Sequence, residues 1–416
     1  MAGLRTKPDI RYEEFTDAWT QRKLSCFLET SKEKNENGDF LREDVLSVSG
    51  DFGIVNQIEF QGRSFAGVSI SNYGVVNTND VVYTKSPLKD NPFGIIKTNK
   101  GRSGVVSTLY AVYKPKVNTD SNFVQCYFEP AYRVNNYLHP LVNKGAKNDM
   151  KVSADNALLG LVIFPSHSEQ IKIAALFDQF DHLITLHQRE YDKTVNIKKA
   201  MLEKMFPKEG ADKPEIRFVG FTDSWEQLEL GGISKVIDPH PSHRAPAESK
   251  TGIPFIGIGD VDEVGNINHG SARIVDEAIY DEHHNRYDLT IPSIGIGRVA
   301  SLGKVIRLRN DIGKYAVSPT MSVIQFHTGN DLDYLYAFMN TPSFQSQFKS
   351  LSNGSTRQSV GIQDLRELQL AVPVSTDEQK QIGMFFSSVN NLITLHQREL
   401  EKLQNMKKAL LEKMFI

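Results

Sequence analysis

The chain has 416 residues, of which 40% are hydrophobic and 24% are charged, and its formal net charge is −2. This length predicts two to three domains of roughly 150 residues each, with enough apolar side chains for a buried core. The balanced charge excludes a uniformly basic surface, the lack of an apolar run of ~18 residues excludes a membrane span, and two cysteines exclude a disulfide scaffold. Since the N-terminal residues carry no apolar signal segment, we expect a cytoplasmic protein.

Two segments with one sequence pattern open the two halves of the chain. Residues 8–19 read PDIRYEEFTDAW and residues 214–225 read PEIRFVGFTDSW, with seven of 12 positions identical. Each segment ends on one of the two tryptophans of the protein, Trp19 and Trp225. Large aromatic side chains stabilise a fold most when they are buried, so we expect both to anchor a core.

The two halves diverge after these openings. Residues 20–155 and 226–360 share only scattered fragments, and both contain short apolar runs between Gly, Asn, Asp and Pro. Such runs are typical of short strands joined by turns. We expect each insert to be a compact, mostly β domain with one or two helices, those of the second insert lying at 332–339 and 343–351. Different inserts on a shared frame indicate one assembly that binds two different ligands of one kind.

Each half ends in a long amphipathic helix, the first predicted over 169–206. Residues 183–206 and 392–415 are identical at 18 of 24 positions, at an offset of 209 residues. In both copies the apolar residues recur mainly at spacings of three and four, close to the heptad pattern of a coiled coil. A helix of ~38 residues is about 57 Å long and cannot bury its apolar stripe against one small domain. We therefore predict that the two copies pack antiparallel, with His187 and His396 in the seam.

Both inserts carry a basic stretch at an equivalent place. Residues 85–116 hold seven Lys or Arg against one acid, and residues 298–314 hold five against one. Lys and Arg bind phosphates, while Arg, Lys, Asn, Gln, Ser and Thr read base edges. Lys85 and Arg298 match in two fragments that align between the halves. A solvated loop explains any single one of these charges, but the duplication of the stretch favours nucleic-acid binding.

Enzyme motifs are incomplete in this sequence. Residues 255–259, FIGIG, fit the glycine turn of S-adenosylmethionine methyltransferases, but no helix pattern follows them. Gly303 and Lys304 are followed by Val305 rather than by the Ser or Thr of a phosphate-binding loop. Four histidines could hold a metal only if folding joined two loops, and we expect exposed loop side chains instead: His240, His243, His283 and His284. We therefore predict no catalytic, cofactor-binding or metal site.

The order of these parts resembles the specificity subunit of type I restriction–modification enzymes, and the likeness covers essentially the whole chain. It rests on the two openings, on the helix ending KKAMLEKMF at 198–206, and on a Pro-to-Glu-Gln motif at 373–379 that recurs, one residue shorter, at 165–170. The resemblance implies an α+β fold in which two mixed, β-rich target-recognition domains are separated by two long antiparallel coiled-coil helices, with an internal pseudo-two-fold repeat. The implied parts are a first recognition domain at 1–160, a first spacer helix at 161–207, a linker at 208–213, a second recognition domain at 214–368 and a second spacer helix at 369–416.

The resemblance also implies a function and partners. Each recognition domain would read one half of a split, asymmetric site in double-stranded DNA, and the helices would dock two methyltransferase subunits and the restriction–translocase subunits. The chain itself would be non-catalytic and without a cofactor, while S-adenosylmethionine, ATP and Mg would bind to the partner subunits. From charge and position, the candidate DNA contacts are Lys85, Arg298, Lys97, Lys100, Arg102, Lys304 and Arg357. Two alternatives remain open: a coiled-coil scaffold without DNA specificity, and a self-contained DNA methyltransferase.

Overall fold

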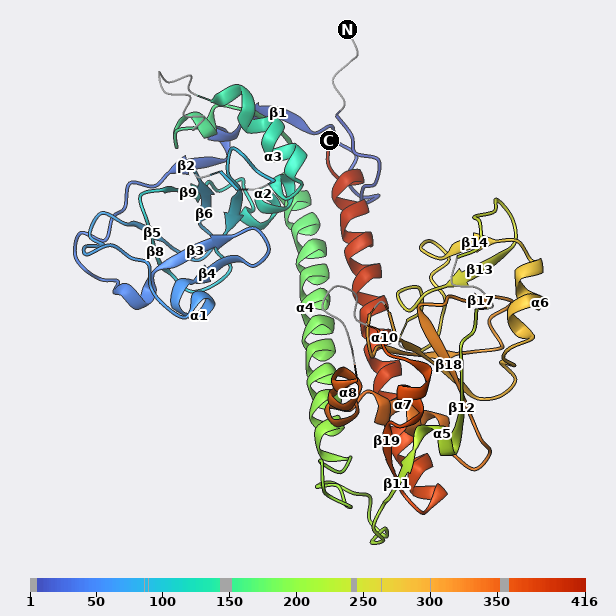
Figure 1. Cartoon of the computed structure of the whole chain (residues 1–416). Helices are drawn as coiled ribbons and strands as arrows, with labels where there is room; N and C mark the ends of the chain where they lie inside the picture. Colours follow the sequence, from blue (N-terminus) through green and yellow to red (C-terminus); the bar gives the residue numbers. More distant parts are fainter. Residues whose placement is uncertain are drawn as a thin grey trace. The chain divides into compact units, whose positions relative to one another are not determined.

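The computed structural model of the chain describes residues 6–85, 87–88, 90–142, 152–240, 245–262, 264–299, 301–351 and 359–416. It consists of two compact units, Met1–Thr185 with Glu401–Ile416, and Leu186–Leu400. The long helices α4 (His167–Lys204) and α10 (Thr376–Lys413) each contribute residues to both units (Figure 1). Within the described ranges, no helix combines the length and the apolar character that a membrane span requires.

The described residues of the first unit form a mixed domain of short strands and short helices. Its largest sheet has four antiparallel strands in the order β2-β9-β6-β7, and the pairs β1-β10, β3-β4 and β5-β8 complete its strands. The elements are β1 (Thr20–Lys23), β2 (Leu28–Thr30), β3 (Leu46–Ser49), β4 (Gly53–Asn56), α1 (Gln57–Gln61), β5 (Gly74–Val76), β6 (Val81–Thr84), β7 (Ile96–Thr98), β8 (Gly104–Val106), β9 (Tyr110–Pro115), α2 (Ser121–Phe128), α3 (Ala131–Leu138) and β10 (Leu161–Phe164).

The second unit has a similar composition. Its four-stranded antiparallel sheet has the order β12-β18-β15-β16, beside a three-stranded sheet β14-β13-β17 and the pair β11-β19. The elements are β11 (Glu226–Glu229), α5 (Leu230–Ile233), β12 (Ser234–Ile237), β13 (Ile253–Ile256), β14 (Arg273–Val275), α6 (Ala278–His284), β15 (Ser293–Gly297), β16 (Val305–Leu308), β17 (Ala316–Val317), β18 (Met321–Phe326), α7 (Leu332–Met339), α8 (Pro342–Ser350), α9 (Ile362–Arg366) and β19 (Gln369–Val372).

The two units share one frame in spite of their divergent inserts. In chain order, β2, β6, β7 and β9 take the same places in their sheet as β12, β15, β16 and β18 take in theirs. In each unit a separate antiparallel pair, β1-β10 or β11-β19, joins the strand after the opening segment to the strand before a long helix. The internal repeat predicted from the sequence is therefore a repeat of topology as well.

A buried, bidentate ion pair ties each opening segment to the first turn of a long helix. Arg11 donates from Nε and Nη2 to the two carboxylate oxygens of Glu169, both at 2.7 Å. Arg217 donates in the same way to Glu378, at 2.6 and 2.8 Å. Each glutamate is 1% exposed and is the third residue of its helix, where the helix dipole favours a negative charge. The hydrogen bond to glutamate raises the pKa of each arginine above its ordinary value.

The glutamine that follows each of these glutamates positions a second helix. Gln170 accepts a hydrogen bond from the backbone N–H of Asp120 at 3.0 Å, and the Asp120 carboxylate caps α2 by accepting from the N–H of Phe123 at 2.8 Å. Gln379 and Asp331 repeat this arrangement at the start of α7, at 3.1 and 2.8 Å. The Glu-Gln pair of each long helix therefore fixes both the opening segment and the helix that follows the large sheet.

The end of each long helix completes the core of one unit. Phe206, two residues beyond α4, packs edge-on against Trp225 with ring centroids 6.1 Å apart. Phe415, two residues beyond α10, packs edge-on against Trp19 at 6.4 Å. All four rings are at most 4% exposed. The prediction that both tryptophans anchor a core is confirmed, and the partner of each is the phenylalanine that ends the KMF sequence.

Within each unit the segments of α4 and α10 run antiparallel, as predicted. In the second unit, Nδ1 of His187 lies 3.3 Å from Nδ1 of His396, which confirms that these histidines lie in the seam. In the first unit, Lys407 of α10 lies 2.6 Å from Asp181 of α4. α4 begins at His167 and ends at Lys204, so each end lies two residues before the predicted bounds of 169 and 206. The helix ends early because the chain turns into the core at Met205.

The inserts contain more helices than predicted. The helices expected at 332–339 and 343–351 are confirmed as α7 and α8, the second displaced by one residue. The prediction of one or two helices per insert is wrong, because the described residues form α1, α2 and α3 in the first insert, and α5 and α6 beside α7 and α8 in the second. Several of these helices are four to eight residues long, too short for a periodic pattern, and depend on tertiary packing.

Replacing one member of a buried ion pair tests the frame. We expect Arg217→Met to lower the stability of the second unit by about 3 kcal/mol, because it leaves the buried Glu378 carboxylate without a cation. The measurement is urea unfolding followed by tryptophan fluorescence and by circular dichroism. The control is Glu190→Gln, which removes an exposed ion pair with Lys193 on α4 and should leave the midpoint nearly unchanged. Equal midpoints for the two variants would contradict the role of the buried pair.

Candidate nucleic-acid interface

Equivalent strands position the first two predicted contact residues. Lys85 directly follows β6 and Arg298 directly follows β15, and these strands occupy the third place in their sheets. Lys85 Nζ donates to the carbonyl oxygen of Thr108 at 2.8 Å, and Arg298 Nη2 donates to Asp238 at 2.7 Å. Burial, and next the charge of Lys34, lower the pKa of Lys85. The two residues correspond in topology, and each is held by a neighbour in its own domain.

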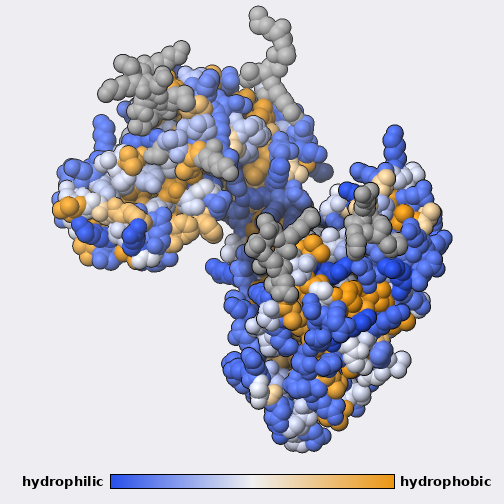
Figure 2. Space-filling view, viewed as in Figure 1, coloured by the Kyte–Doolittle hydropathy of each residue, from blue (hydrophilic) through white to orange (hydrophobic). Residues whose placement is uncertain are grey.

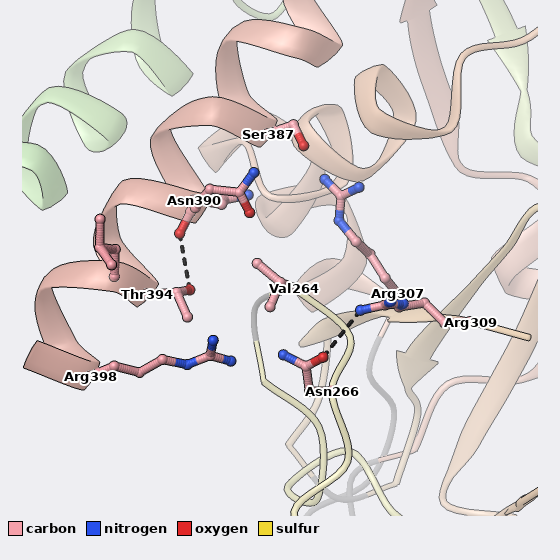
Figure 3. Close-up of a pocket in the computed structure, with 10 residues that line it drawn as sticks. Val264, Asn266, Arg307, Arg309, Ser387, Asn390, Thr394 and Arg398 are labelled. Carbon is pink, nitrogen blue, oxygen red and sulfur yellow. Dashed lines mark hydrogen bonds between the residues drawn. The ribbon is translucent and has the colours of Figure 1, made fainter. Parts of the chain in front are cut away.

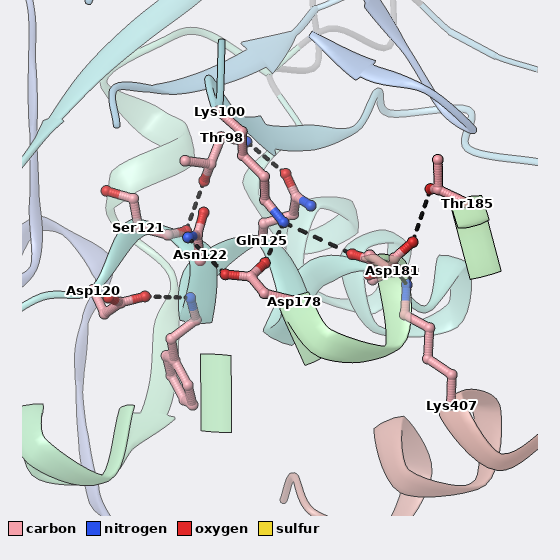
Figure 4. A network of polar contacts seen from close by, with 12 residues as sticks. Thr98, Lys100, Asp120, Ser121, Asn122, Gln125, Asp178, Asp181, Thr185 and Lys407 are labelled. Carbon is pink, nitrogen blue, oxygen red and sulfur yellow. Dashed lines mark hydrogen bonds and ion pairs between the residues drawn. The ribbon is translucent and has the colours of Figure 1, made fainter. Parts of the chain in front are cut away.

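Two further predicted residues line one pocket of the first unit. Lys97 lies on β7 and is 9% exposed, and Lys100 lies two residues beyond this strand. The pocket has a volume of about 500 Å³. Lys100 Nζ lies 2.5 Å from Asp178 and 3.7 Å from Asp181, both on α4 (Figure 4). Burial lowers the pKa of Lys97; for Lys100, burial acts in the same direction but the two aspartates outweigh it and raise the pKa.

The remaining predicted residues lie elsewhere. Arg102 is 60% exposed and its Nη2 lies 3.2 Å from Glu59 Oε1. Lys304 is exposed in the turn before β16, and Arg357 lies outside the described residues. The structure therefore brings Lys97 and Lys100 into one pocket, while Arg102 and Lys304 are exposed.

Lys407 of α10 belongs to the same pocket and was missed by the sequence analysis. Its Nζ lies 2.5 Å from Glu129 and 2.6 Å from Asp181, and its side chain is 12% exposed. Burial favours the neutral amine, but the two acids outweigh it and raise the pKa of Lys407. The helix repeat held a signal, because Lys198 is the identical residue at an offset of 209.

A pocket of the second unit collects three arginines that were not singled out from the sequence. Arg307 and Arg309, at the end of β16, line it together with Arg398 of α10, and its volume is about 480 Å³. Figure 3 shows Asn390, Thr394 and Arg398 on α10 facing the loop and strand that carry the other residues. Arg307 and Arg309 belong to the basic stretch 298–314 that the sequence analysis described. Arg398 lies far along the chain from this stretch, so its place in the same pocket could not be predicted.

Exposed apolar side chains gather around β3, β4 and α1 of the first unit. The rings of Phe52 and Phe60 lie 5.3 Å apart, and orange residues show on this part of the unit in Figure 2. Apolar patches that stay exposed on a folded domain mark interaction surfaces. The residues, with their exposed fractions, are Leu41 (63%), Phe52 (68%), Phe60 (45%), Phe65 (56%) and Val68 (97%).

Comparisons with known proteins agree with this architecture. Residues 222–405 match the family model described as the type I restriction modification DNA specificity domain. The second half of the chain is therefore similar to the DNA specificity domain of type I restriction–modification systems. A crystal structure of the S subunit of such a system from M. genitalium has the same fold, with a TM-score of 0.63 and 12% identity over 99% of this chain and 99% of that one.

A curated relative from Methanocaldococcus jannaschii is described as the MjaX specificity subunit of a type I restriction enzyme. The two are 20% identical over 280 residues, which are 65% of this chain and 62% of that protein. The chain therefore spans less than two thirds of the length of this relative. The fold of this chain follows from the likeness to the solved S subunit.

The glycine turn at 257–259 does not have the surroundings of a methyltransferase cofactor site. Residues 253–256 form β13, the N–H of Gly257 is bonded to the Asp260 carboxylate at 2.8 Å, and the next regular element is the strand β14. A cofactor turn of that kind would lead into a helix. Within the described ranges, no three His, Cys, Asp or Glu side chains are grouped as metal ligands would be.

The expectation of exposed loop histidines is wrong for the three that the structure describes, because His240 and His283 are buried and the half-buried His284 is on α6. His240 is 5% exposed and His283 is 1% exposed, and their rings meet edge-on with centroids 4.5 Å apart. His284 stacks on Tyr280 at 3.9 Å, and His243 lies outside the described residues. This contact could not be predicted from the sequence pattern, because it forms only when α6, which carries His283, packs against the loop after β12, which carries His240. The pair is part of the packing of the second domain.

This burial predicts a dependence of stability on pH. Burial, and then the charge of His240, lower the pKa of His283 to about 4, so the folded protein binds a proton less readily than the unfolded chain. Stability should be complete above the ordinary histidine pKa of about 6.5 and fall by about 2 kcal/mol as the pH drops to 5. Urea unfolding of wild type and His283→Leu at pH 7.5 and 5 measures this. The variant should lose less stability on acidification, with His284 retaining part of the effect; identical losses would contradict the assignment.

Proposed function

We propose that the chain is the non-catalytic specificity subunit of a type I restriction–modification complex, in which each domain binds one half of a split, asymmetric site in double-stranded DNA. The observation that supports this most is the pair of sheets with one strand order and different loops. Two domains built on one frame can approach DNA in the same way and still contact different bases. Joining two weak readers in one chain raises affinity through effective concentration.

The proposed DNA contacts are the basic residues around the matching strands. Lys304 is exposed, and Arg102, Lys100 and Arg298 would each exchange a carboxylate partner for the DNA backbone. For the exposed pair of Arg102 this exchange costs at most about 1 kcal/mol, which a phosphate contact repays, and for the more buried pair of Arg298 it costs more. The set comprises Lys85, Lys97, Lys100, Arg102, Arg298, Lys304 and Arg357.

The long helices are proposed to dock two methyltransferase subunits. Three exposed apolar residues of α4 recur at an offset of 209 on α10, and at 100° per residue each set falls within an arc of about 60°. Ile393 and Leu400, which are 6% and 7% exposed, lie on a different side of α10. The same apolar strip presented twice suits two copies of one partner. The pairs, with exposed fractions, are Leu183 (40%) and Leu392 (47%), Leu186 (46%) and Leu395 (53%), and Ile197 (42%) and Met406 (46%).

Charged substitutions in the strips test this docking. We expect Leu186→Lys and Leu395→Lys each to reduce the number of bound methyltransferase subunits from two to one, and the double variant to bind none, because a lysine in an apolar contact is costly to desolvate. Light scattering after size-exclusion chromatography gives the mass of each complex. The matched control is Gln188→Lys, an exposed position on α4 where Gln188 contacts Asp192 at 3.0 Å. Two bound subunits in all variants would contradict the proposal.

The partners would supply the chemistry that this chain lacks. The methyltransferase subunits would bind S-adenosylmethionine, rotate an adenine out of the duplex and methylate it. Restriction–translocase subunits would add ATP- and Mg-dependent motor and nuclease activity. Since DNA and these partners meet in the cytoplasm, the complex would work there.

Methylome sequencing tests the proposed function directly. The chain is expressed with a candidate methyltransferase subunit in a host without type I systems, beside a chimera whose residues 230–368, between β11 and β19, come from another family member. We expect a split motif with N6-methyladenine in each half, of which the exchange alters one half. The reciprocal chimera, exchanging residues 24–160 between β1 and β10, should alter the other half.

Two outcomes would contradict the proposal. A chimera that changes both halves, or neither, would mean that the domains do not read separate half-sites. A chain that binds no DNA with any methyltransferase partner would be a protein-binding scaffold instead.

A further inference from the structure

The arginine pocket of the second unit and the lysine pocket of the first occupy the same place in the shared frame. Val81 of β6 pairs with Thr98 of β7, and Ile294 of β15 pairs with Arg307 of β16. Val81 and Ile294 each lie four residues before the matching Lys85 and Arg298. Thr98 and Arg307 are therefore equivalent positions. Two residues further along the chain, Lys100 of the first unit corresponds to Arg309 of the second.

The helix that faces each pocket also corresponds, because α4 and α10 align at an offset of 209. Ser387 and Asn390 stand on α10 where Asp178 and Asp181 stand on α4. In the first unit these carboxylates bind Lys100 and Lys407, so the anionic partners of the pocket are built into the chain (Figure 4). In the second unit the corresponding positions carry a hydroxyl and an amide.

Each arginine of the second pocket has an aspartate beside it. Arg309 binds Asp311 through two hydrogen bonds of 2.8 and 2.6 Å, Arg307 pairs with Asp333 and lies over the Tyr336 ring at 4.4 Å, and Arg398 lies 3.8 Å from Asp262. Of the described residues, three arginines and no acid line the pocket. A guanidinium has five N–H donors, more than these contacts use.

A buried amide in the pocket lacks a partner. Asn390 is 3% exposed, and its Oδ1 is buried without a hydrogen bond among the described residues. An unsatisfied buried polar atom costs about 1–3 kcal/mol, so its persistence needs an explanation. The amide oxygen and nitrogen exchange places on a half-turn of the side chain, which would direct an NH2 donor into the pocket beside the arginines (Figure 3).

We propose that this pocket binds a phosphate group, which takes the position that the Asp178 and Asp181 carboxylates fill in the first unit. Guanidinium forks with amide and hydroxyl donors form the donor set that suits a tetrahedral oxyanion. The backbone of double-stranded DNA is the source that agrees with the proposed function, and in that form the inference rests on it. The second domain would thereby hold a phosphate at the base of its sheet, where the first domain places the carboxylates of Asp178 and Asp181.

The experiment installs the acids of the first unit in the second. The double variant Ser387→Asp/Asn390→Asp of the full chain is compared with wild type and with Gln381→Asp/Ser388→Asp, which makes the same change of charge at exposed positions of α10. Fluorescence anisotropy measures binding of a labelled 20-base-pair duplex of arbitrary sequence as salt is raised. Thermal unfolding with and without inorganic phosphate, followed by tryptophan fluorescence, measures binding of the free anion.

We expect the pocket variant to bind the duplex about tenfold more weakly than the control variant at low salt, with the slope of log affinity against log salt reduced by about one. We also expect inorganic phosphate to raise the unfolding temperature of wild type and of the control, but not of the pocket variant. Loss of the phosphate effect with unchanged DNA binding would support the pocket and reject DNA as its source. Equal DNA binding and equal phosphate effects in all three proteins would overturn the inference. If wild type itself bound no duplex, the proposed function would fail, and the phosphate arm would still decide the pocket.

Discussion

The frame depends on an arginine–glutamate pair buried at the start of each long helix. Burying two charges is expensive, and the attraction repays the loss of water only when both side chains are fully hydrogen-bonded. Two parallel bonds join each pair and satisfy both carboxylate oxygens of Glu169 and of Glu378, while Nη1 of Arg11 has no hydrogen bond among the described residues. Because the partners lie 158 and 161 residues apart, each pair also fixes where the whole intervening domain begins and ends. Such an ion pair favours one arrangement of the opening segment and the helix over other arrangements that would bury as much apolar surface.

A fixed frame explains how the inserts can diverge. The Glu-Gln pair, the tryptophan and the terminal phenylalanine recur in both units, while the loops between the strands do not. The two pockets next to the long helices differ in their residues although they lie at equivalent positions of the frame. At one topological position the first unit holds lysines neutralised by aspartates, and the second holds arginines facing an amide and a hydroxyl. The two units therefore carry different residues at equivalent positions, although the strand order of their sheets is the same.

Much of the architecture could be predicted from the sequence because repetition and periodicity are local signals. The 18 identities between the helix copies, their apolar spacing and the two tryptophans indicated the helices, the seam histidines and the cores. Contacts between distant segments could not be predicted, since they depend on how strands align and side chains turn. Lys407 meeting Asp181 and His240 meeting His283 are of this kind. Arg398 was missed for the same reason: on a helix surface it reads as one more solvated charge.

The way the helix ends close the cores also sets an order for folding during synthesis. The second unit is one continuous stretch, Leu186–Leu400, whereas the first combines Met1–Thr185 with Glu401–Ile416. The apolar core around Trp19 lacks Leu411, Met414 and Phe415 until the ribosome has passed these residues. The part of the protein that is translated first is therefore the last that can complete its core. Until then it exposes apolar surface, the condition in which nascent chains aggregate or recruit chaperones.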